Sequence, residues 1–454
     1  MTPTELKKHP DYILYKPIIE RGRGTYILGI ILAAIFLWTM YMYSTQLRWG
    51  LGVTGLDNRI SWGFYIVNFV FFIGISHAGT LISAILRLSK AEWRRPITRM
   101  AEVTTAIVLA IGGLHPILDL GKPDNLLNIF FYGRLQSPLL WDVTAITCYF
   151  TASTVYLYLP MIPDIARLRD MGVRPHWLYQ FLSWGWAGTE RQKKILDRAL
   201  TIMMVLVIPI AVSVHTVISF IFSMTLQPGW HSTIFGPYFV VGAIFSGIAA
   251  LLIVMIVFRK AFHLEGYLKP VHFRYLSTLL LIMSFLWFYF TFSEYLTGFY
   301  GHEPTEMRTI LYKFTGDYWP FFWAMVICNF VIPVSILSFK KLKTITGIFI
   351  ASLAVIVGMW LERLNIVVPS LTIPRLEYAP QMYTPTMVEW ALFLAGLAVF
   401  ALAFLIFSRL FPIISVWEIE EGREEVETVK KRIESYQPDT DTGREGQIQT
   451  EGSP

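Results

Sequence analysis

The chain alternates between long apolar runs and short polar segments over most of its length. Ten runs are long enough, at about 20 residues each, to cross the roughly 30 Å hydrocarbon core of a bilayer as helices. Barrel strands would alternate polar and apolar residues, so the pattern predicts an all-α polytopic membrane protein. The expected spans are about 25–43, 61–86, 98–118, 139–160, 199–224, 238–258, 275–296, 318–338, 344–362 and 386–408.

Basic residues gather in alternate loops. The segments 7–23, 87–99, 167–198, 259–274 and 340–343 are rich in Lys and Arg, whereas the loops between them hold few. By the positive-inside rule, this asymmetry predicts that both termini lie in the cytoplasm. It also accounts for the formal net charge of +6, so binding of nucleic acid is not indicated. Charged residues make up only 15% of the chain, below the roughly 25% of soluble proteins.

Two of the runs begin with the same pattern. The second span opens with GxYxV at 63–67, and the sixth span, four spans later, repeats it at 236–240. The match favours two four-helix bundles, spans two to five and six to nine, with one flanking helix at each end; chance similarity is the alternative. The expected parts are a cytoplasmic N-terminal segment (1–24), the first transmembrane helix with an outer loop (25–60), the first bundle (61–224), the second bundle (225–364), an outer loop with the last transmembrane helix (365–411), and a cytoplasmic tail that is partly disordered (412–454).

Four titratable residues are expected at a similar depth near the outer face. His115 and Asp119 end the third span, Asp142 begins the fourth, and His215 lies near the outer end of the fifth. His115 and Asp119 are four residues apart and share one helix face, and Pro116 between them is expected to kink that turn. A polar rim at the membrane surface would explain each residue alone. Their coincidence favours a site, because ionisable groups in a membrane are costly.

A second polar group is expected toward the cytoplasm. His77, Thr80 and Ser83 follow one stripe of the second span, and Glu102 enters the third span from inside. The group could be a half-channel for protons, and it could equally be a set of polar contacts between packed helices.

The second half of the chain also carries charges within or next to its spans. Glu294, the neighbouring pair Glu362 and Arg363, and Glu389 are expected at the outer ends of these spans. Glu362 and Arg363 need partners, since either charge alone would be costly in a membrane. Their role is open at this point.

Quinone chemistry fits the outer group of titratable residues. A lipid-soluble quinone exchanges two electrons and two protons, so its pocket must open to the bilayer and hold groups that give or accept protons. Histidine titrates near neutral pH, and desolvation brings aspartate toward that range. The electrons must pass to another subunit. The chain has no C-x-x-C-H motif, and its two cysteines, Cys148 and Cys328, are fewer than the four or so that hold an iron–sulfur cluster.

Two other functions are compatible with these residues. A haem b needs two histidines that face each other from different helices, for which His115 and His215 are candidates. A secondary transporter or proton-conducting channel needs no redox group. Transporters more often break matched helices in the middle, whereas the break expected here, at Pro116, is at an outer end and favours the quinone site.

Several segments resemble the NrfD/PsrC-like family of membrane quinone subunits. They are "WGFYIVNFVFFIGISHAGTLISAILRL", "DLGKP", "QSPLLWD", "SEYLTGFYGHEPTE" and "GMWLERLNIVVPSL" followed by "YTPTMVEW". The similarity runs from about Trp62 to Trp417 and is strongest to the ten-helix branch found in alternative complex III and in the quinone reductase complex.

The resemblance implies two four-helix bundles, a menaquinone or ubiquinone site near the periplasmic face of the first, and no haem or iron–sulfur cluster in this chain. It implies a bacterial inner membrane location and a periplasmic iron–sulfur subunit over the site. Further subunits would include a molybdopterin-type protein and a multihaem cytochrome c. The suspected proton paths of the family correspond to the region of His77, Thr80 and Glu102.

The resemblance also assigns site residues. The carboxylate of the "SPLLWD" segment, a proposed quinone ligand, corresponds to Asp142, with Trp141 beside it. Many ten-helix relatives read "HLGRP" where this chain reads "DLGKP", so the family's histidine corresponds to Asp119. A histidine occurs four positions earlier, and we expect His115 to take over the imidazole role.

Overall fold

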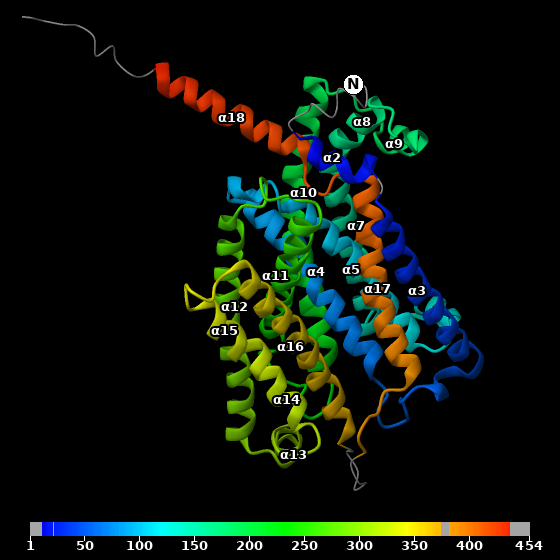
Figure 1. Cartoon of the computed structure of the whole chain (residues 1–454). Helices are drawn as coiled ribbons and strands as arrows, with labels where there is room; N and C mark the ends of the chain where they lie inside the picture. Colours follow the sequence, from blue (N-terminus) through cyan, green and yellow to red (C-terminus); the bar gives the residue numbers. More distant parts are fainter. Residues whose placement is uncertain (1–10, 21, 374–380, 436–454) are drawn as a thin grey trace, which may run out of the picture.

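The computed structural model describes residues 11–20, 22–373 and 381–435, and the described residues are mostly helical, with no strand among them. Ten helices are long and apolar enough to cross a membrane (Figure 1). They are α3 (Arg23–Trp49), α4 (Phe64–Leu88), α5 (Thr98–Asp119), α7 (Pro138–Tyr158), α10 (Glu190–Ser223), α11 (Phe235–Ala261), α12 (Pro270–Gly301), α14 (Trp319–Val326) continued through a π-helical turn (Ile327–Val331) into α15 (Ile332–Leu337), α16 (Ile345–Thr372) and α17 (Met387–Leu410).

The ten expected spans are confirmed, although the ninth extends well past its expected end. It was expected to end near residue 362, but α16 continues to Thr372. Glu362, Arg363 and Asn365 lie inside this helix, and each is only 1% exposed. A hydropathy pattern ends a span at charged residues, whereas in the structure these charges are enclosed by neighbouring helices. The prediction that Glu362 and Arg363 lie at an outer end of a span is therefore wrong.

Helix contacts arrange eight of the spans in two rings. In the first, α4 and α7 each pack against both α5 and α10. In the second, α11 and the α14–α15 segment flank α12 and α16. The two rings meet mainly where α4 packs against α11, and α16 also contacts α4. The helices that begin with the repeated GxYxV pattern thus form the seam between the rings.

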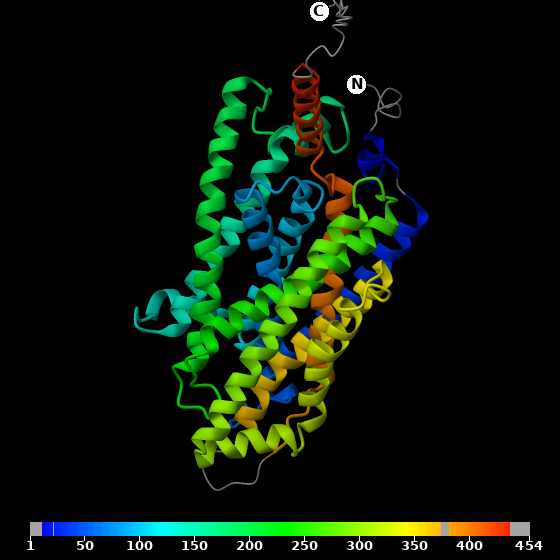
Figure 2. The same cartoon turned by 90° about the vertical axis from the view of Figure 1, so that its left-hand side faces the viewer.

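The first and last spans, α3 and α17, lie side by side although they are far apart in sequence (Figure 1). α17 also packs against α4 and α5, so the pair covers one side of the first ring. One end of the molecule carries α2 (Tyr12–Ile19), α8 (Ile162–Asp170), α9 (His176–Leu182) and α18 (Val416–Ser435), and we call it the terminal face. The opposite end, with α13 (Pro304–Phe314), is the distal face (Figure 2).

The C-terminal tail begins as part of the terminal face. Glu418, in the first turn of α18, is buried and lies 2.8 Å from Arg87 and 3.0 Å from Arg94. The next turns of α18 are also bonded to the terminal face, because Glu425 lies 2.6 Å from Arg95 and Arg423 lies 2.8 Å from Asp11. The remainder of α18 extends away from the other helices (Figure 1). The disorder expected for the end of the tail concerns residues 436–454, which lie outside the described residues.

Candidate functional site

His115 lies in the next-to-last turn of α5 and is 2% exposed. Its Nδ1 is 2.9 Å from the carbonyl oxygen of Ile111, and its ring centroid is 5.4 Å from that of Phe72 on α4. A carbonyl can only accept a hydrogen bond, so Nδ1 carries the proton and Nε2 keeps an open lone pair. Nε2 is buried and has no hydrogen-bond partner among the described residues. α5 continues as a helix through Pro116 to Asp119.

Asp119 ends α5 close to the flanking helices. The side chain of Gln46 on α3 donates to the carbonyl of the preceding residue, Leu118, at 2.7 Å. Gln46 also accepts a hydrogen bond from the Tyr65 hydroxyl of α4 at 2.6 Å. These bonds fix the end of α5 between α3 and α4. The Oδ1 atom of Asp119 is buried without a hydrogen-bond partner in the described part of the chain.

Asp142, in the first turns of α7, is 7% exposed, and its Oδ1 is also buried without a partner among the residues described. A Cβ placed on Gly113 of α5 would be 3.8 Å from the Ile146 side chain of α7. Because the two helices run antiparallel, Asp142, one turn outward from Ile146, lies opposite the last turns of α5. The neighbouring Trp141 is 39% exposed and donates its indole hydrogen to the carbonyl of Leu135 at 2.5 Å.

His215 has different neighbours from those expected. Its ring centroid is 3.6 Å from that of His77 on α4, and both of its ring nitrogens lack a hydrogen-bond partner among the described residues. No hydrogen bond, ion pair or ring contact joins it to His115, Asp119 or Asp142 in the described structure. Depth along a helix can be counted from sequence, but the rotation of α10 about its axis turns His215 toward α4. The proposed haem pair of His115 and His215 gains no support from this arrangement.

The predicted inner group is a series of buried polar side chains that begins at His77. The His77 ring lies 5.4 Å from that of Tyr149, whose hydroxyl donates to Thr80 at 3.2 Å. Farther along α4, the Ser83 hydroxyl donates to Glu102 at 2.6 Å. All five side chains are buried, and they line the interior of the first ring between α4, α5 and α7.

Several members of this series were missed from sequence. Ser83 also contacts the Tyr156 hydroxyl at 3.2 Å, and Arg87 lies 3.9 Å from Glu102 and 2.8 Å from Glu418. The series ends at a cleft of about 810 Å³ in the terminal face, whose lining includes Arg87 and Glu418. The sequence held a signal for the members on α7, because Tyr149, Ser153 and Tyr156 recur at helical spacing on one face of that helix.

Charges in the second half of the chain are largely paired within the protein. Glu362 accepts a hydrogen bond from the Trp287 indole at 2.7 Å and lies 3.1 Å from Arg363. The Arg363 guanidinium lies over the Phe239 ring, 4.9 Å from its centroid. A Cβ at Gly242 would be 2.9 Å from this guanidinium, so the missing side chain makes room for it. These groups hold α11, α12 and α16 together.

Glu389, on the flanking helix α17, lies beside the start of α4 in the first ring. It accepts hydrogen bonds from the backbone N–H groups of Gly55 at 2.7 Å and of Thr386 at 2.9 Å, and a third from the Tyr383 hydroxyl. Tyr383 in turn accepts from the N–H of Phe64 at 3.0 Å. The carboxylate therefore joins the start of α17 to the loop after α3 and has a structural role.

A small cavity of about 40 Å³ lies near the distal face of the second ring, and its lining includes Glu294, Glu306 and Lys313. The Ser232 hydroxyl donates to Glu294 at 2.5 Å. Lys313, on α13, is 4% exposed and lies over the Tyr295 ring, 5.8 Å from its centroid. Burial lowers the pKa of Lys313 to about 8, against a smaller upward effect of Glu294.

Comparison with known proteins gives consistent matches over most of the chain. Residues 52–375 match the family model described as "Polysulphide reductase, NrfD". The chain is 27% identical, over 86% of its length and 92% of the relative's, to a putative dimethyl sulfoxide reductase membrane protein of Halobacterium salinarum. It is 27% identical, over 88% and 96%, to the "Hdr-like menaquinol oxidoreductase integral membrane subunit" of Archaeoglobus fulgidus. It is 25% identical, over 82% and 90%, to a selenate reductase subunit of Mesobacillus selenatarsenatis.

Proposed function

The chain belongs to the polysulphide reductase NrfD family, and we propose that it binds quinone or quinol between α5 and α7 as the membrane subunit of an oxidoreductase complex. The observation that carries the proposal is a set of three buried atoms without hydrogen-bond partners among the described residues: His115 Nε2, Asp119 Oδ1 and Asp142 Oδ1. An unsatisfied buried polar group costs roughly 1–3 kcal/mol, so three at one end of one ring favour a missing ligand.

The chemistry assigned to these atoms is proton exchange with the quinone head group. Oxidation of a quinol releases two electrons and two protons. The open lone pair of His115 Nε2 accepts one proton from a quinol hydroxyl, and the carboxylate of Asp142 or Asp119 accepts the other. In quinone reduction the same groups donate. The two electrons pass to, or arrive from, a neighbouring subunit.

The route for a lipid-soluble head group runs beside α6 (Leu126–Tyr132), the short helix that joins α5 to α7. Its side chains Phe130, Phe131 and Tyr132 are 63%, 76% and 81% exposed. Exposed aromatic residues at the end of two spans suit the membrane interface. Together with Trp141, they would line the way from the acyl chains to Asp142. The quinone would be menaquinone or ubiquinone, and the name of the Archaeoglobus fulgidus relative favours menaquinone.

The proposed orientation places the terminal face in the cytoplasm and the distal face in the periplasm of a bacterial inner membrane. The distribution of Lys and Arg among the loops supports this orientation. A periplasmic iron–sulfur subunit would then cover the distal face of the first ring and exchange electrons with the quinone. Two relatives are named as subunits of reductases, which supports the presence of partner subunits. We expect these partners to include a molybdopterin-type protein and a multihaem cytochrome c.

A second candidate function is proton conduction, because the polar series runs from His77 to Glu418 through the first ring. His77, Thr80, Ser83 and Glu102 would pass protons between the quinone site and the cleft in the terminal face. In a subunit without redox chemistry, the same series would form a proton channel or part of a transporter. Glu102→Gln would reduce proton uptake by vesicles that contain the protein, whether the series serves the quinone site or a channel without redox chemistry. Proton uptake that depends on added quinol would indicate that conduction is coupled to the quinone site.

The quinone site is tested in the intact complex with Asp142→Asn and His115→Ala. Each should lower quinol-linked turnover by roughly 10²-fold, the scale on which a positioned acid or base acts. Thr144→Ala, an exposed residue of the same helix α7, is the matched control. Turnover of the soluble subunits with an artificial electron donor should stay unchanged, which separates loss of the site from loss of assembly. Unchanged quinol turnover in both variants would refute the placement.

A Soret band in the visible spectrum of the purified chain would instead favour a haem b carrier.

A further inference from the structure

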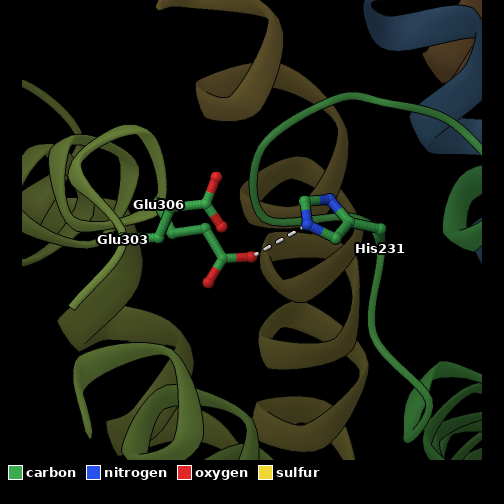
Figure 3. A group of neighbouring side chains, drawn as sticks. All are labelled: His231, Glu303 and Glu306. Carbon is green, nitrogen blue, oxygen red and sulfur yellow. Dashed lines mark ion pairs between the residues drawn. The ribbon is translucent and has the colours of Figure 1, made fainter. Parts of the chain in front are cut away.

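Three potential metal ligands meet at the distal face of the second ring. His231 lies in the loop between α10 and α11, Glu303 precedes α13, and Glu306 lies in its first turn. One ligand atom from each lies within 4.8 Å of the other two. His231 Nε2 is 3.4 Å from Glu306 Oε1, and both carboxylates point toward the imidazole (Figure 3). The group is thus built from two segments that are far apart in the sequence.

The hydrogen bond on the far side of the imidazole determines what the group can hold. His231 Nδ1 is 3.3 Å from the carbonyl oxygen of Gln227, which can only accept, so Nδ1 carries a proton. Nε2 therefore faces the two carboxylates, and in the neutral imidazole it directs a lone pair toward them. A lone pair and two anions repel each other unless a proton or a cation lies between them. A backbone carbonyl behind the imidazole is the usual outer partner of a metal-bound histidine.

The loop that carries His231 is anchored on both sides. The preceding Trp230 donates its indole hydrogen to the carbonyl of Ile366 on α16 at 2.6 Å. The following Ser232 donates to Glu294 on α12 at 2.5 Å. The loop is therefore bonded to two other helices on either side of His231. Rigid neighbours of this kind keep metal ligands in place before the ion arrives.

We propose that His231, Glu303 and Glu306 bind a divalent transition-metal ion of the zinc class. One imidazole and two carboxylates are ligands that zinc accepts, and a water molecule would complete a tetrahedral site. Imidazole disfavours magnesium and calcium, which prefer oxygen ligands. The bound ion would link the α10–α11 loop to α13 and close the distal side of the small cavity lined by Glu306, Glu294 and Lys313. Binding at this site is independent of the quinone chemistry.

The direct test is to titrate ZnCl₂ into the purified full-length chain and to measure the heat of binding by calorimetry. The chain carries no histidine tag and is first stripped of metal with a chelator. The wild type should bind one zinc ion at this site. His231→Ala and Glu306→Gln should each weaken binding by at least about tenfold. His176→Ala, which removes an exposed histidine at the terminal face, should bind zinc as the wild type does. An equal concentration of MgCl₂ should not compete.

A second measurement keeps the test decisive if His231→Ala fails to fold. In hydrogen exchange of the wild type, zinc should slow exchange in α13 and in residues 224–234, and this effect should be absent in Glu306→Gln. No zinc binding by the wild type would mean that the group is only an ion pair between His231 and Glu306, and would overturn the proposal. Equal binding by the wild type, His231→Ala and Glu306→Gln would also overturn it, because the zinc would then bind elsewhere.

Discussion

The two ends of the first ring differ in how their buried carboxylates are partnered, although the Nε atoms of Arg87, Arg94 and Arg99 at the terminal face also lack a partner among the described residues. At the terminal face, Arg99 lies 2.6 Å from Asp164, and Glu418 lies between Arg87 and Arg94. At the distal end, one polar atom of each of three side chains, those of His115, Asp119 and Asp142, has no partner among the described residues. Arg99, His115 and Asp119 all belong to α5, whereas the carboxylates that pair at the terminal face come from α8 and α18.

We interpret the partnered groups as groups that stabilise the fold and the unpartnered groups as groups that bind a ligand. A buried charge is tolerated when partners and hydrogen bonds replace water. Asp164, for example, accepts hydrogen bonds from the N–H groups of Val416 and Trp417, each at 3.1 Å, in addition to its contact with Arg99. The distal atoms lack such replacement within the described chain. We infer that the terminal face is a structural closure and that the distal end is shaped for binding.

The largest effect is expected at the terminal closure. Asp164→Ala would leave Arg99 buried without its carboxylate, a loss that costs about 3–5 kcal/mol. A thermal unfolding scan of the purified chain should show a clearly lower Tm. Asp170→Ala is the matched control: it removes an exposed carboxylate 2.8 Å from Arg169, and exposed pairs contribute about 0–1 kcal/mol. Similar Tm losses in the two variants would contradict the structural role of the closure.

The distal face of the second ring offers the next largest effect, through Lys313. Its pKa falls from 10.5 in the unfolded chain to about 8 in the fold, so between these values the unfolded chain binds more protons. Stability should therefore rise as the pH increases from about 8 to 10.5, and below 8 the buried charge should cost up to roughly 3 kcal/mol.

Lys313→Met should raise the Tm at pH 7 and reduce the gain in Tm between pH 8 and pH 10. Lys122→Met removes an exposed lysine, also at the distal end, and should change neither quantity. If the Tm of Lys313→Met depended on pH in the same way as that of the wild type, the lysine would stay charged in the fold and be stabilised by the cavity.

A smaller effect is expected at the proposed quinone site, and its sign is opposite to that of Asp164→Ala. Asp142→Leu removes a carboxyl oxygen that has no partner among the described residues, so the free energy of unfolding should stay unchanged or rise by about 1 kcal/mol. A thermal unfolding scan measures the stability of this variant. Asp164→Leu, which removes a paired carboxylate at the terminal face, is the comparison. A large loss of Tm in Asp142→Leu would assign Asp142 a structural role.

The smallest effect concerns the pH dependence of the first turn of α18. Burial alone would raise the pKa of Glu418, but Arg87, Arg94 and Arg99 outweigh it, and the net pKa lies below the usual 4.5. Its stabilising effect is therefore complete above about pH 4.5 and is lost as the pH falls through the folded value. Spin labels on α18 and α10 should report a broader distance distribution in acid. Glu418→Gln should show the broad distribution already at pH 7.

The sequence predicted the spans well because hydrocarbon imposes a simple requirement on length and polarity. It failed where the protein itself replaces the solvent, as at Glu362 and Arg363, whose mutual contact and indole neighbour allow α16 to continue. His115 and Asp142 were both predicted for the candidate site, because their depth could be counted along adjacent helices. The pairing of His215 with His77 could not be predicted, since it depends on how α10 is rotated against α4.

By itself, the sequence determined that this chain crosses a membrane ten times, which residues end most of the spans, and that titratable groups are concentrated near the ends of α5 and α7. Only the tertiary structure decided which titratable groups of the chain are paired with one another. The Glu418 carboxylate reaches Arg87 across more than 300 residues of chain, and His231 meets Glu306 although α11 and α12 lie between them in the sequence. Apolar length is a local property of the chain, whereas satisfaction of a buried charge depends on neighbours that only packing brings together.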